Sequence, residues 1–199
     1  MLSSRSHTVT VDGISLTVPR GVLDPVLFRS GAWAAQQIAA RLTPGQRLLD
    51  LGCGSGVIGA LAMRAGAEIV AVDIDRRAVK AARSNGLLDV RHGDLFAPVA
   101  EERFDVIAFN PPYFPGQPHL KRHGRALYGG RRLEVMRRFA EQLPAHISPG
   151  GQALVVLSDR APHALAALGN GWEEATSGSV TDALGTETLT LYSWKTLPR

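Results

Sequence analysis

The residues best suited to chemistry are Asn110, Pro111, Pro112 and Tyr113, which directly follow an apolar run over residues 104–109. The run predicts a buried strand that stops where the prolines remove two backbone donors. In open α/β sheets, ligands bind at the carboxyl ends of the strands. The Asn110 oxygen and a nearby backbone carbonyl can accept both hydrogens of a planar –NH2 group, while Tyr113 stacks on its face. The pattern therefore predicts a pocket for an amide or an aromatic amine, although Asn-Pro-Pro-Tyr is also the composition of an ordinary turn.

A glycine-rich loop forms a second candidate site. Gly52, Cys53, Gly54 and Gly56 lie between a predicted strand over residues 47–51 and a predicted helix over residues 57–65. Such a loop lets a ligand approach the backbone without interference from a Cβ atom, although alone it is also a common tight turn. The dinucleotide fingerprint requires a third glycine where this chain has Val57, which disfavours a nicotinamide or flavin cofactor. Cys53 lacks a partner base and fits a small packing residue better than a nucleophile.

Carboxylates end the next two predicted strands. Asp73 ends a strand over residues 68–75 and lies 21 positions after residue 52, the separation at which an acidic side chain reaches a ribose diol. The alternative for Asp73 is a helix cap, a role that Asp75 fits better before the helix predicted over residues 76–85. Asp94 follows a short strand within residues 89–96 and can accept from an adenine amino group, with Ile74 and Leu95 as apolar walls.

The remaining pattern predicts the elements that position these residues. Alternating polar and apolar residues over 7–18, centred on Asp12 and Gly13, predict a β-hairpin. Apolar residues at three- and four-residue steps predict a helix over 24–42. Helices are expected over 133–146 and 161–168, and strands over 152–157, 172–180 and 187–194. Strands that alternate with helices indicate an α/β fold, which at 199 residues we expect to be one domain, with an extension over 1–20 and a core over 21–199.

The composition limits the class of protein, its location and its partners. Hydrophobic residues make up 45% of the chain and charged residues 20%, as in ordinary globular proteins. The chain shows neither an apolar stretch that could cross a membrane nor the apolar segment of a signal peptide. One cysteine excludes an internal disulfide, so a cytoplasmic location is expected. A net charge of +4 only weakly favours polyanionic partners.

Four motifs together resemble the class I S-adenosylmethionine-dependent methyltransferases; they occupy residues 50–56, 72–75, 93–96 and 110–113. The Asn-Pro-Pro-Tyr form is similar to that of amino-methyltransferases that modify exocyclic or amide nitrogens. Residues 16–20 and the Ala-Leu-Tyr-Gly-Gly segment after residue 125 are similar to the HemK (PrmC) glutamine methyltransferases. Residues 21–25 depart from the usual HemK sequence. Without the separate helical domain that grips release factors, the chain resembles compact single-domain relatives, some of which use a small activator subunit.

The resemblance implies a Rossmann-like, seven-stranded, mostly parallel sheet with helices on both faces and an antiparallel last strand. It also implies S-adenosylmethionine as methyl donor. The implied cofactor contacts are Asp50, Gly52, Cys53, Gly54 and Gly56 at the methionine end, Asp73 at the ribose, Ile74, Asp94 and Leu95 at the adenine, and Asn110. In the implied reaction, Asn110 and the Pro111 carbonyl hold the acceptor nitrogen, Pro112 and Tyr113 complete the motif, and no strong base is needed before transfer.

Three functions follow from the resemblance and the charge pattern. The first is N-methylation of a protein glutamine, with a release factor or ribosomal protein as substrate. The second is methylation of an adenine or guanine amine in RNA or DNA, which the basic region over residues 121–138 favours if that region contacts phosphate rather than solvent. The third is a non-catalytic cofactor-binding subunit, against which the intact Asn110 and Tyr113 argue. His119 and His123 have no third ligand, so we expect no metal.

Overall fold

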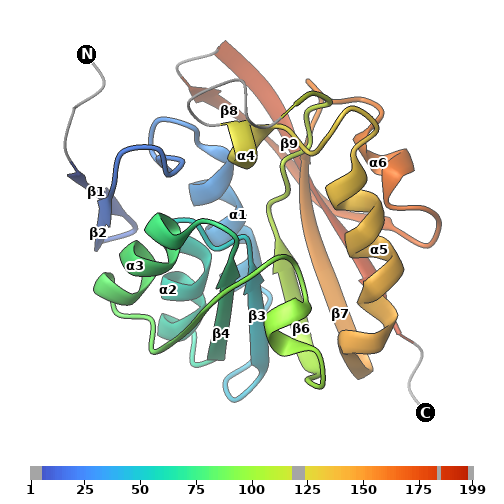
Figure 1. Ribbon diagram of the computed structural model, residues 1–199, viewed down its shortest axis with the longest axis horizontal. Coiled ribbons are helices and arrows are strands. Elements are labelled where there is room, and N and C mark those ends of the chain that lie inside the picture. The colour runs from blue at the N-terminus through green and yellow to red at the C-terminus, as the bar shows by residue number, and fades with distance from the viewer. Residues whose placement is uncertain (1–5, 118–123, 183–184, 197–199) are drawn as a thin grey trace.

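A seven-stranded sheet runs through the centre of the protein in this computed structural model, which describes residues 6–117, 124–182 and 185–196 (Figure 1). The strand order is β5-β4-β3-β6-β7-β9-β8. The strands are β3 (Arg47–Leu51), β4 (Glu68–Asp73), β5 (Asp89–His92), β6 (Phe104–Phe109), β7 (Ile147–Ser158), β8 (Glu173–Asp182) and β9 (Gly185–Lys195). Of these, β9 is antiparallel to both of its neighbours, β7 and β8. The predicted α/β, Rossmann-like, mostly parallel sheet with an antiparallel last strand is confirmed.

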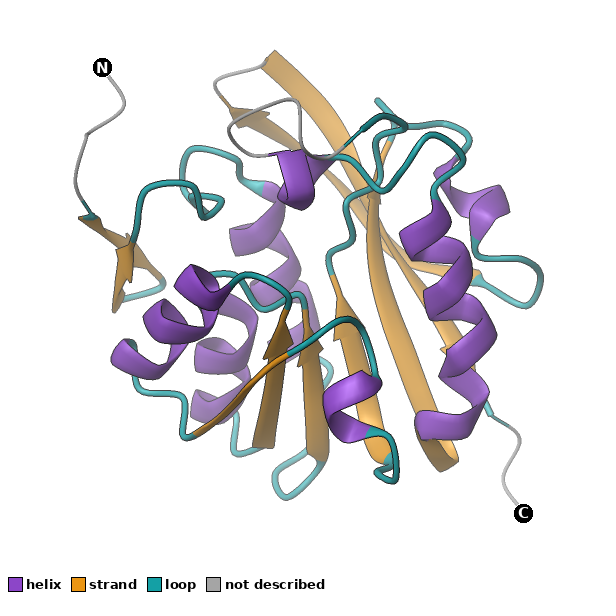
Figure 2. Cartoon of the chain, in the orientation of Figure 1, coloured by secondary structure: helices purple, strands orange, loops and turns teal. Residues whose placement is uncertain are grey.

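Helices cover both faces of the sheet, because successive strand residues point to opposite sides. The helices on one face are α1 (Ser30–Ala39), α2 (Val57–Arg64) and α3 (Arg76–Ser84), and those on the other are α5 (Glu134–His146) and α6 (Ala164–Ala167) (Figure 2). Leu48 packs with the α1 and α2 side, whereas its neighbour Leu49 packs with the α5 side. A short 3-10 helix, η1 (Ala97–Val99), precedes β6, and α4 (Gly124–Leu127) precedes α5.

The order of the strands creates a switch point beside β3. From β3 the chain proceeds outward through β4 and β5, and then returns to place β6 on the other side of β3. Leu51 pairs with Val72 of β4 and with Phe109 of β6. The next residue of each strand is Gly52, Asp73 or Asn110. The register therefore brings three of the predicted site residues to one edge of the sheet.

The N-terminal hairpin has the predicted form. Strands β1 (His7–Val11) and β2 (Ile14–Val18) pair with Val11 opposite Ile14, so that only two residues form the turn. Asp12 and Gly13 both have positive φ, 47° and 79°, which is the turn geometry that suits the twist of a hairpin. Asn85 at the end of α3 holds β2, since its side chain accepts from Thr17 N and donates to Thr17 O.

The prediction of a helix over residues 24–42 is wrong at its start. Helix α1 begins only at Ser30. The Asp24 carboxylate accepts from the backbone N–H groups of Val26 and Leu27, at 2.8 and 3.0 Å, and this local turn competes with helix formation. The correction matters because it makes Ser30 the first residue of a helix that faces the site.

Two other boundaries differ from expectation. Strand β7 begins at Ile147, five residues before the predicted 152, and thus includes Pro149 and Gly150. Its pairing with β6 shifts register between Phe104 and Val106, an irregularity that accommodates this start. Helix α6 covers only 164–167 of the predicted 161–168. None of the helices in the described part of the chain is long and apolar enough to span a membrane.

Candidate active site

A cavity of about 490 Å³ opens over the carboxyl ends of β3, β4 and β6. It coincides with the switch point, where ligands bind in open α/β sheets. Most of the predicted cofactor residues line it, namely Gly52, Cys53, Gly54, Asp73, Ile74, Asp94, Leu95 and Asn110. Two predicted contacts, Asp50 and Gly56, are not part of its wall. The segment after the hairpin, from Gly21 to Leu23, forms a further wall that the sequence did not indicate.

Asp73 ties the glycine loop to the start of α3. Its two carboxylate oxygens accept from Gly54 N at 2.9 Å and from Asp75 N at 2.8 Å. Asp75 caps α3 by accepting from Arg77 N, as predicted, so the helix-cap alternative for Asp73 is wrong. Burial raises the pKa of Asp73, although the two backbone hydrogen bonds oppose that shift. Each oxygen keeps a second lone pair for a ligand hydroxyl in the cavity.

Asp50 lies behind the glycine loop rather than in the cavity wall. Its Oδ2 accepts from Gly59 N in α2 at 2.9 Å, and its Oδ1 is buried without a hydrogen-bond partner among the described residues. Burial raises the pKa of Asp50 from 3.8 to about 7, and the nearby Asp73 adds to the shift. A carboxyl whose pKa is higher in the folded protein stabilises the fold at low pH, and this contribution is lost as the pH rises from about 4 to about 7.

Gly56 has a packing role instead of a ligand contact. A Cβ atom at this position would lie 3.0 Å from Leu87 and 3.2 Å from the Cβ of Ala82, and its φ of +86° favours glycine. The glycine lets the start of α2 lie close against α3 and the loop that follows it.

The opposite end of the cavity combines apolar and charged side chains. Ile74 is 43% exposed and Leu95 is buried with a φ of +48°, a conformation that is uncommon outside glycine and asparagine. Asp94 forms an ion pair with Arg138 of α5, which donates to its Oδ2 at 2.7 Å. Both side chains of this pair are more than 40% exposed, so the ion pair orients Asp94 more than it stabilises the fold. Arg138, which the sequence placed only in a basic region, therefore holds a residue of the cavity wall without lining the cavity itself.

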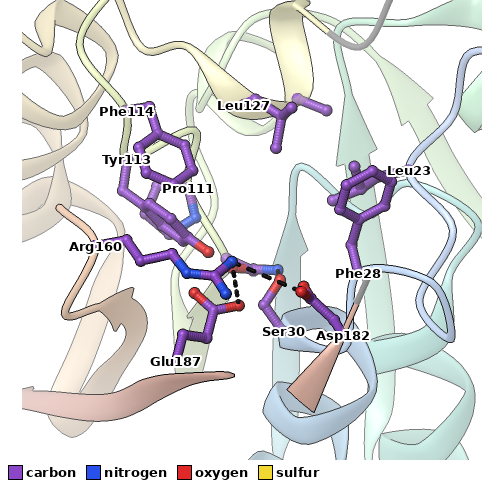
Figure 3. Close-up of a pocket in the computed structure, with 12 residues that line it drawn as sticks. Leu23, Phe28, Ser30, Pro111, Tyr113, Phe114, Leu127, Arg160, Asp182 and Glu187 are labelled. Atoms are coloured by element: carbon purple, nitrogen blue, oxygen red, sulfur yellow. Dashed lines mark hydrogen bonds and ion pairs between the residues drawn. The ribbon is translucent and has the colours of Figure 1, made fainter. Parts of the chain in front are cut away.

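A second, smaller cavity of about 20 Å³ lies on the other side of Asn110 (Figure 3). Asn110 lines both cavities, Pro111 and Tyr113 line the small one, and Pro112 lines the large one. Apolar side chains contribute to the small cavity from Leu23, Phe28, Phe114 and Leu127. The predicted Asn-Pro-Pro-Tyr motif therefore separates the two cavities.

The Asn110 side chain is oriented by Ser30. Its Nδ2 donates to Ser30 Oγ at 3.4 Å, which leaves the amide oxygen directed elsewhere. That Oδ1 atom is buried and accepts no hydrogen bond within residues 6–117, 124–182 and 185–196. Tyr113 is also buried, and burial raises the pKa of its phenol, so that it stays neutral. An unpaired buried oxygen costs about 1–3 kcal/mol, which indicates that it pairs with a ligand donor.

The Ala-Leu-Tyr-Gly-Gly segment packs against the Asn-Pro-Pro-Tyr loop. Phe114 N donates to Leu127 O, and Gly129 N donates back to Phe114 O, each at 3.0 Å. A Cβ atom on Gly129 would lie only 2.3 Å from the carbonyl oxygen of Pro112. The segment thus covers the Pro112 carbonyl and leaves the Pro111 residue beside the small cavity.

Three charged residues in the wall of the small cavity had no sequence signal. Arg160 Nη1 lies 3.7 Å from Asp182 Oδ1 and 3.7 Å from Glu187 Oε1. Ser158 donates to the other oxygen of Glu187. Figure 3 shows the Arg160 guanidinium between the Tyr113 side and the two carboxylates. These residues follow β7 or belong to β8 and β9, and only the strand order brings them to Asn110.

The basic region is only partly described. Of the residues singled out in the sequence, Lys121, Arg122, His119 and His123 lie outside the described residues. Exposed arginines lie after the Asn-Pro-Pro-Tyr loop in the sequence, at positions 131, 132, 137 and 138. Arg137 donates to the Arg132 carbonyl and Arg138 to Asp94, so part of this surface has local partners.

Comparisons with known proteins match this geometry. Residues 33–170 match the family model described as methyltransferase small domain. A release factor glutamine methyltransferase from Gloeobacter violaceus is 32% identical over 174 residues, which cover 77% of this chain and 61% of that protein. A ribosomal protein uL3 glutamine methyltransferase from Bradyrhizobium diazoefficiens is 32% identical over 67% of this chain and 48% of its own. The chain thus spans about half to three fifths of these relatives.

A solved structure extends the similarity in fold. The Thermus thermophilus 16S rRNA N2 G1207 methyltransferase, in complex with AdoMet and guanosine, has a TM-score of 0.65 and 23% identity, and covers 98% of this chain and 52% of its own. Fold and site define a Rossmann-like methyltransferase. The chain belongs to the methyltransferase small domain family. The predicted membership of a methyltransferase family is confirmed.

Proposed function

We propose that this protein transfers a methyl group to the amide nitrogen of a glutamine side chain in a protein. The observation that carries this proposal is the Asn110 Oδ1 atom, which is buried without a described partner at the boundary of the two cavities. An acceptor in the small cavity and a methyl donor in the large one would meet at this atom. An amide –NH2 group is the donor that such an oxygen lacks.

The large cavity fits S-adenosylmethionine, which supplies an electrophilic methyl group on its sulfonium. Asp73 could accept from the ribose hydroxyls, and Ile74 and Leu95 would enclose the adenine beside Asp94. The glycine loop would lie against the methionine end. Asp50 Oδ1, which has no hydrogen-bond partner among the described residues, lies behind this loop, where its carboxylate would favour the cationic amino group. Its raised pKa would fall on cofactor binding for the same reason.

The residues around Asn110 would compensate for the weak nucleophilicity of the acceptor's amide nitrogen. The lone pair of an amide nitrogen is delocalised, so reactivity depends on holding the nitrogen in line with the methyl group. Asn110 Oδ1 and the Pro111 carbonyl would accept its two N–H groups, while Ser30 fixes the Asn110 side chain. Positioning of this kind can contribute about 7–11 kcal/mol in favourable intramolecular reactions. The nitrogen proton becomes acidic as the new bond forms, so no strong base is required.

The lining of the small cavity suits a side-chain carboxamide, because the buried Asn110 oxygen lies among the apolar side chains of Leu23, Phe28 and Leu127. The names of the relatives at 32% identity support glutamine, with release factors and ribosomal proteins as candidate substrates. A nucleobase amine is the second candidate, which the exposed arginines at 131 and 132 favour.

The chemistry of the product provides the test. Lysate of a strain that lacks this gene would be incubated with the protein and methyl-labelled S-adenosylmethionine. Acid hydrolysis of an N-methylated glutamine releases labelled methylamine, whereas a methylated base keeps its label. We expect protease-sensitive label that is recovered as methylamine. Nuclease-sensitive label without methylamine would refute the glutamine assignment.

Variants connect that product to the site. Asn110→Ala should abolish transfer and leave donor affinity nearly unchanged, since Asp73 and the glycine loop remain. Replacement of both Arg131 and Arg132 by Gln is the matched control for nucleic-acid contact. Transfer that is unchanged in this double variant supports a protein acceptor, and a strong loss that high salt reproduces in the wild type supports RNA or DNA.

A further inference from the structure

Arg160 is an unusual feature of the acceptor cavity. Its side chain is only 23% exposed, and the two carboxylates beside it, Asp182 and Glu187, are 2% and 4% exposed. The distances of 3.7 Å from Nη1 to both carboxylates are ion-pair distances, too long for good hydrogen bonds. In the described part of the chain, no acceptor within hydrogen-bond range pairs with any of the five guanidinium N–H groups.

Such a cluster is costly if it serves only the fold. Desolvation of buried ion pairs consumes much of their attraction, and well-packed apolar residues are often as stable or more stable. Ser158 adds a hydrogen bond to Glu187, which further orders the acidic side of the cluster. The cluster lies in the wall of the cavity that contains Asn110 and Tyr113. Its cost is understandable if the guanidinium contacts a ligand there.

The two unsatisfied groups of this cavity are complementary to a single chemical group. Among the described residues, Asn110 Oδ1 has no donor, and the Arg160 guanidinium has two ion-pair partners at 3.7 Å but no acceptor within hydrogen-bond range. A carboxamide has both, with N–H donors at one end and a carbonyl oxygen at the other. We propose that Arg160 is a specificity-determining residue that donates to the carbonyl oxygen of the acceptor amide whose nitrogen Asn110 holds. This inference rests on the proposed function.

The arrangement also discriminates between acceptors. A guanine whose N1–H edge faces Arg160 would set a donor against the guanidinium donors, whereas an adenine presents an acceptor, N1, beside its amino group and is separated from a carboxamide by the methylamine readout. A site built to pair a buried polar group rejects a ligand that leaves the group unpaired. Glu187, held by Ser158, and Asp182 would act as positioning residues that fix the guanidinium.

The test removes the guanidinium and keeps the side-chain stem. Arg160→Met should lower the methylamine-yielding transfer into lysate protein by about 30-fold, the effect of losing a charged hydrogen bond. The affinity for S-adenosylmethionine should stay within about twofold, because Arg160 does not line the large cavity. Free guanidinium added at millimolar concentration should restore part of the activity of a smaller variant, Arg160→Ala. Arg76→Met, at an exposed position of α3 outside both cavities, is the matched control and should be unchanged.

The outcomes separate this inference from the proposed function. If the wild type yields methylamine and Arg160→Met yields as much, the inference is wrong and the glutamine assignment stands. If the wild type yields no methylamine, the proposed function fails and the inference fails with it. If Arg160→Met does not fold, Glu187→Gln keeps the volume and the Ser158 contact. It should raise the KM for the acceptor severalfold at unchanged donor affinity, and an unchanged KM would overturn the inference.

Discussion

Replacement of Gly129 by alanine tests whether the proposed catalytic loop, residues 110–113, depends on the Ala-Leu-Tyr-Gly-Gly segment that packs against it. The added Cβ would lie 2.3 Å from the Pro112 carbonyl oxygen, about 1 Å closer than ordinary contact. Neither atom can rotate away, because the backbone of residue 129 fixes the Cβ and the oxygen belongs to the Pro112 backbone. A hydrogen bond of 3.0 Å from Gly129 N–H to Phe114 O also holds the two segments together. The clash can therefore be relieved only if one of these two segments moves, and the hydrogen bond between them transmits that movement to the loop that carries Asn110.

A displacement of about 1 Å at a positioning group can cost about 100-fold in rate. We expect Gly129→Ala to lower kcat in the labelled-methyl assay by about this factor, while donor affinity, measured by calorimetry, stays within threefold. Gly150→Ala is the control, since its φ of +75° brings similar or greater backbone strain but nothing lies within 4 Å of the new Cβ. It should lower stability without lowering kcat. A Gly129→Ala enzyme with kcat within threefold of wild type would refute the reasoning.

Three further variants probe the site. Asp50→Asn should remove the pH dependence of stability that burial of this carboxyl imposes. Between pH 5 and pH 8 the wild type should lose about 3 kcal/mol of unfolding free energy relative to the variant. Urea unfolding that changes equally with pH in both proteins would contradict this. Asp73→Asn replaces an acceptor oxygen by an NH2 group that faces a backbone N–H. The affinity for S-adenosylmethionine should therefore fall at least tenfold, and the unfolding free energy by about 1–3 kcal/mol. Unchanged calorimetric binding of S-adenosylmethionine would exclude the ribose role of Asp73. Ser30→Ala should free the Asn110 amide and lower kcat about tenfold at constant donor affinity, and a loss confined to donor binding would disprove this orienting role.

The sequence predicted the parts of the site that are local in the chain. The glycine loop, Asp73 and Asn110 each directly follow an apolar strand, so their positions depend only on short-range patterns and on the rule that ligands bind at carboxyl strand ends. Leu95, with its positive φ, was expected as an apolar wall and lines the cavity. The same rule could not predict that Asp50 lies behind the loop, since depth below a surface is not a periodic property.

The acceptor side depends on contacts between distant segments. Arg160 and Glu187 reach Asn110 only because β9 inserts between β7 and β8, an order that hydrophobic periodicity does not encode. Ser30 was hidden because the helical pattern extends upstream of the true start of α1, where Asp24 forms a turn instead. Arg138 pairs with Asp94 across 44 residues of sequence. These residues could be found only once the topology was known.

The two cavities draw on different parts of the chain. The large cavity is built mainly by segments before residue 113, whereas the charged wall of the small one comes from Arg160, Asp182 and Glu187. If the small cavity receives the acceptor, as proposed, substitutions in the last three strands would alter which acceptor is chosen while the large cavity is inherited unchanged. A fold divided in this way can diversify its substrates after gene duplication without first losing its methyl donor. The same division offers a design route, in which exchange of residues 158–187 between relatives would transplant acceptor choice onto a constant donor-binding half.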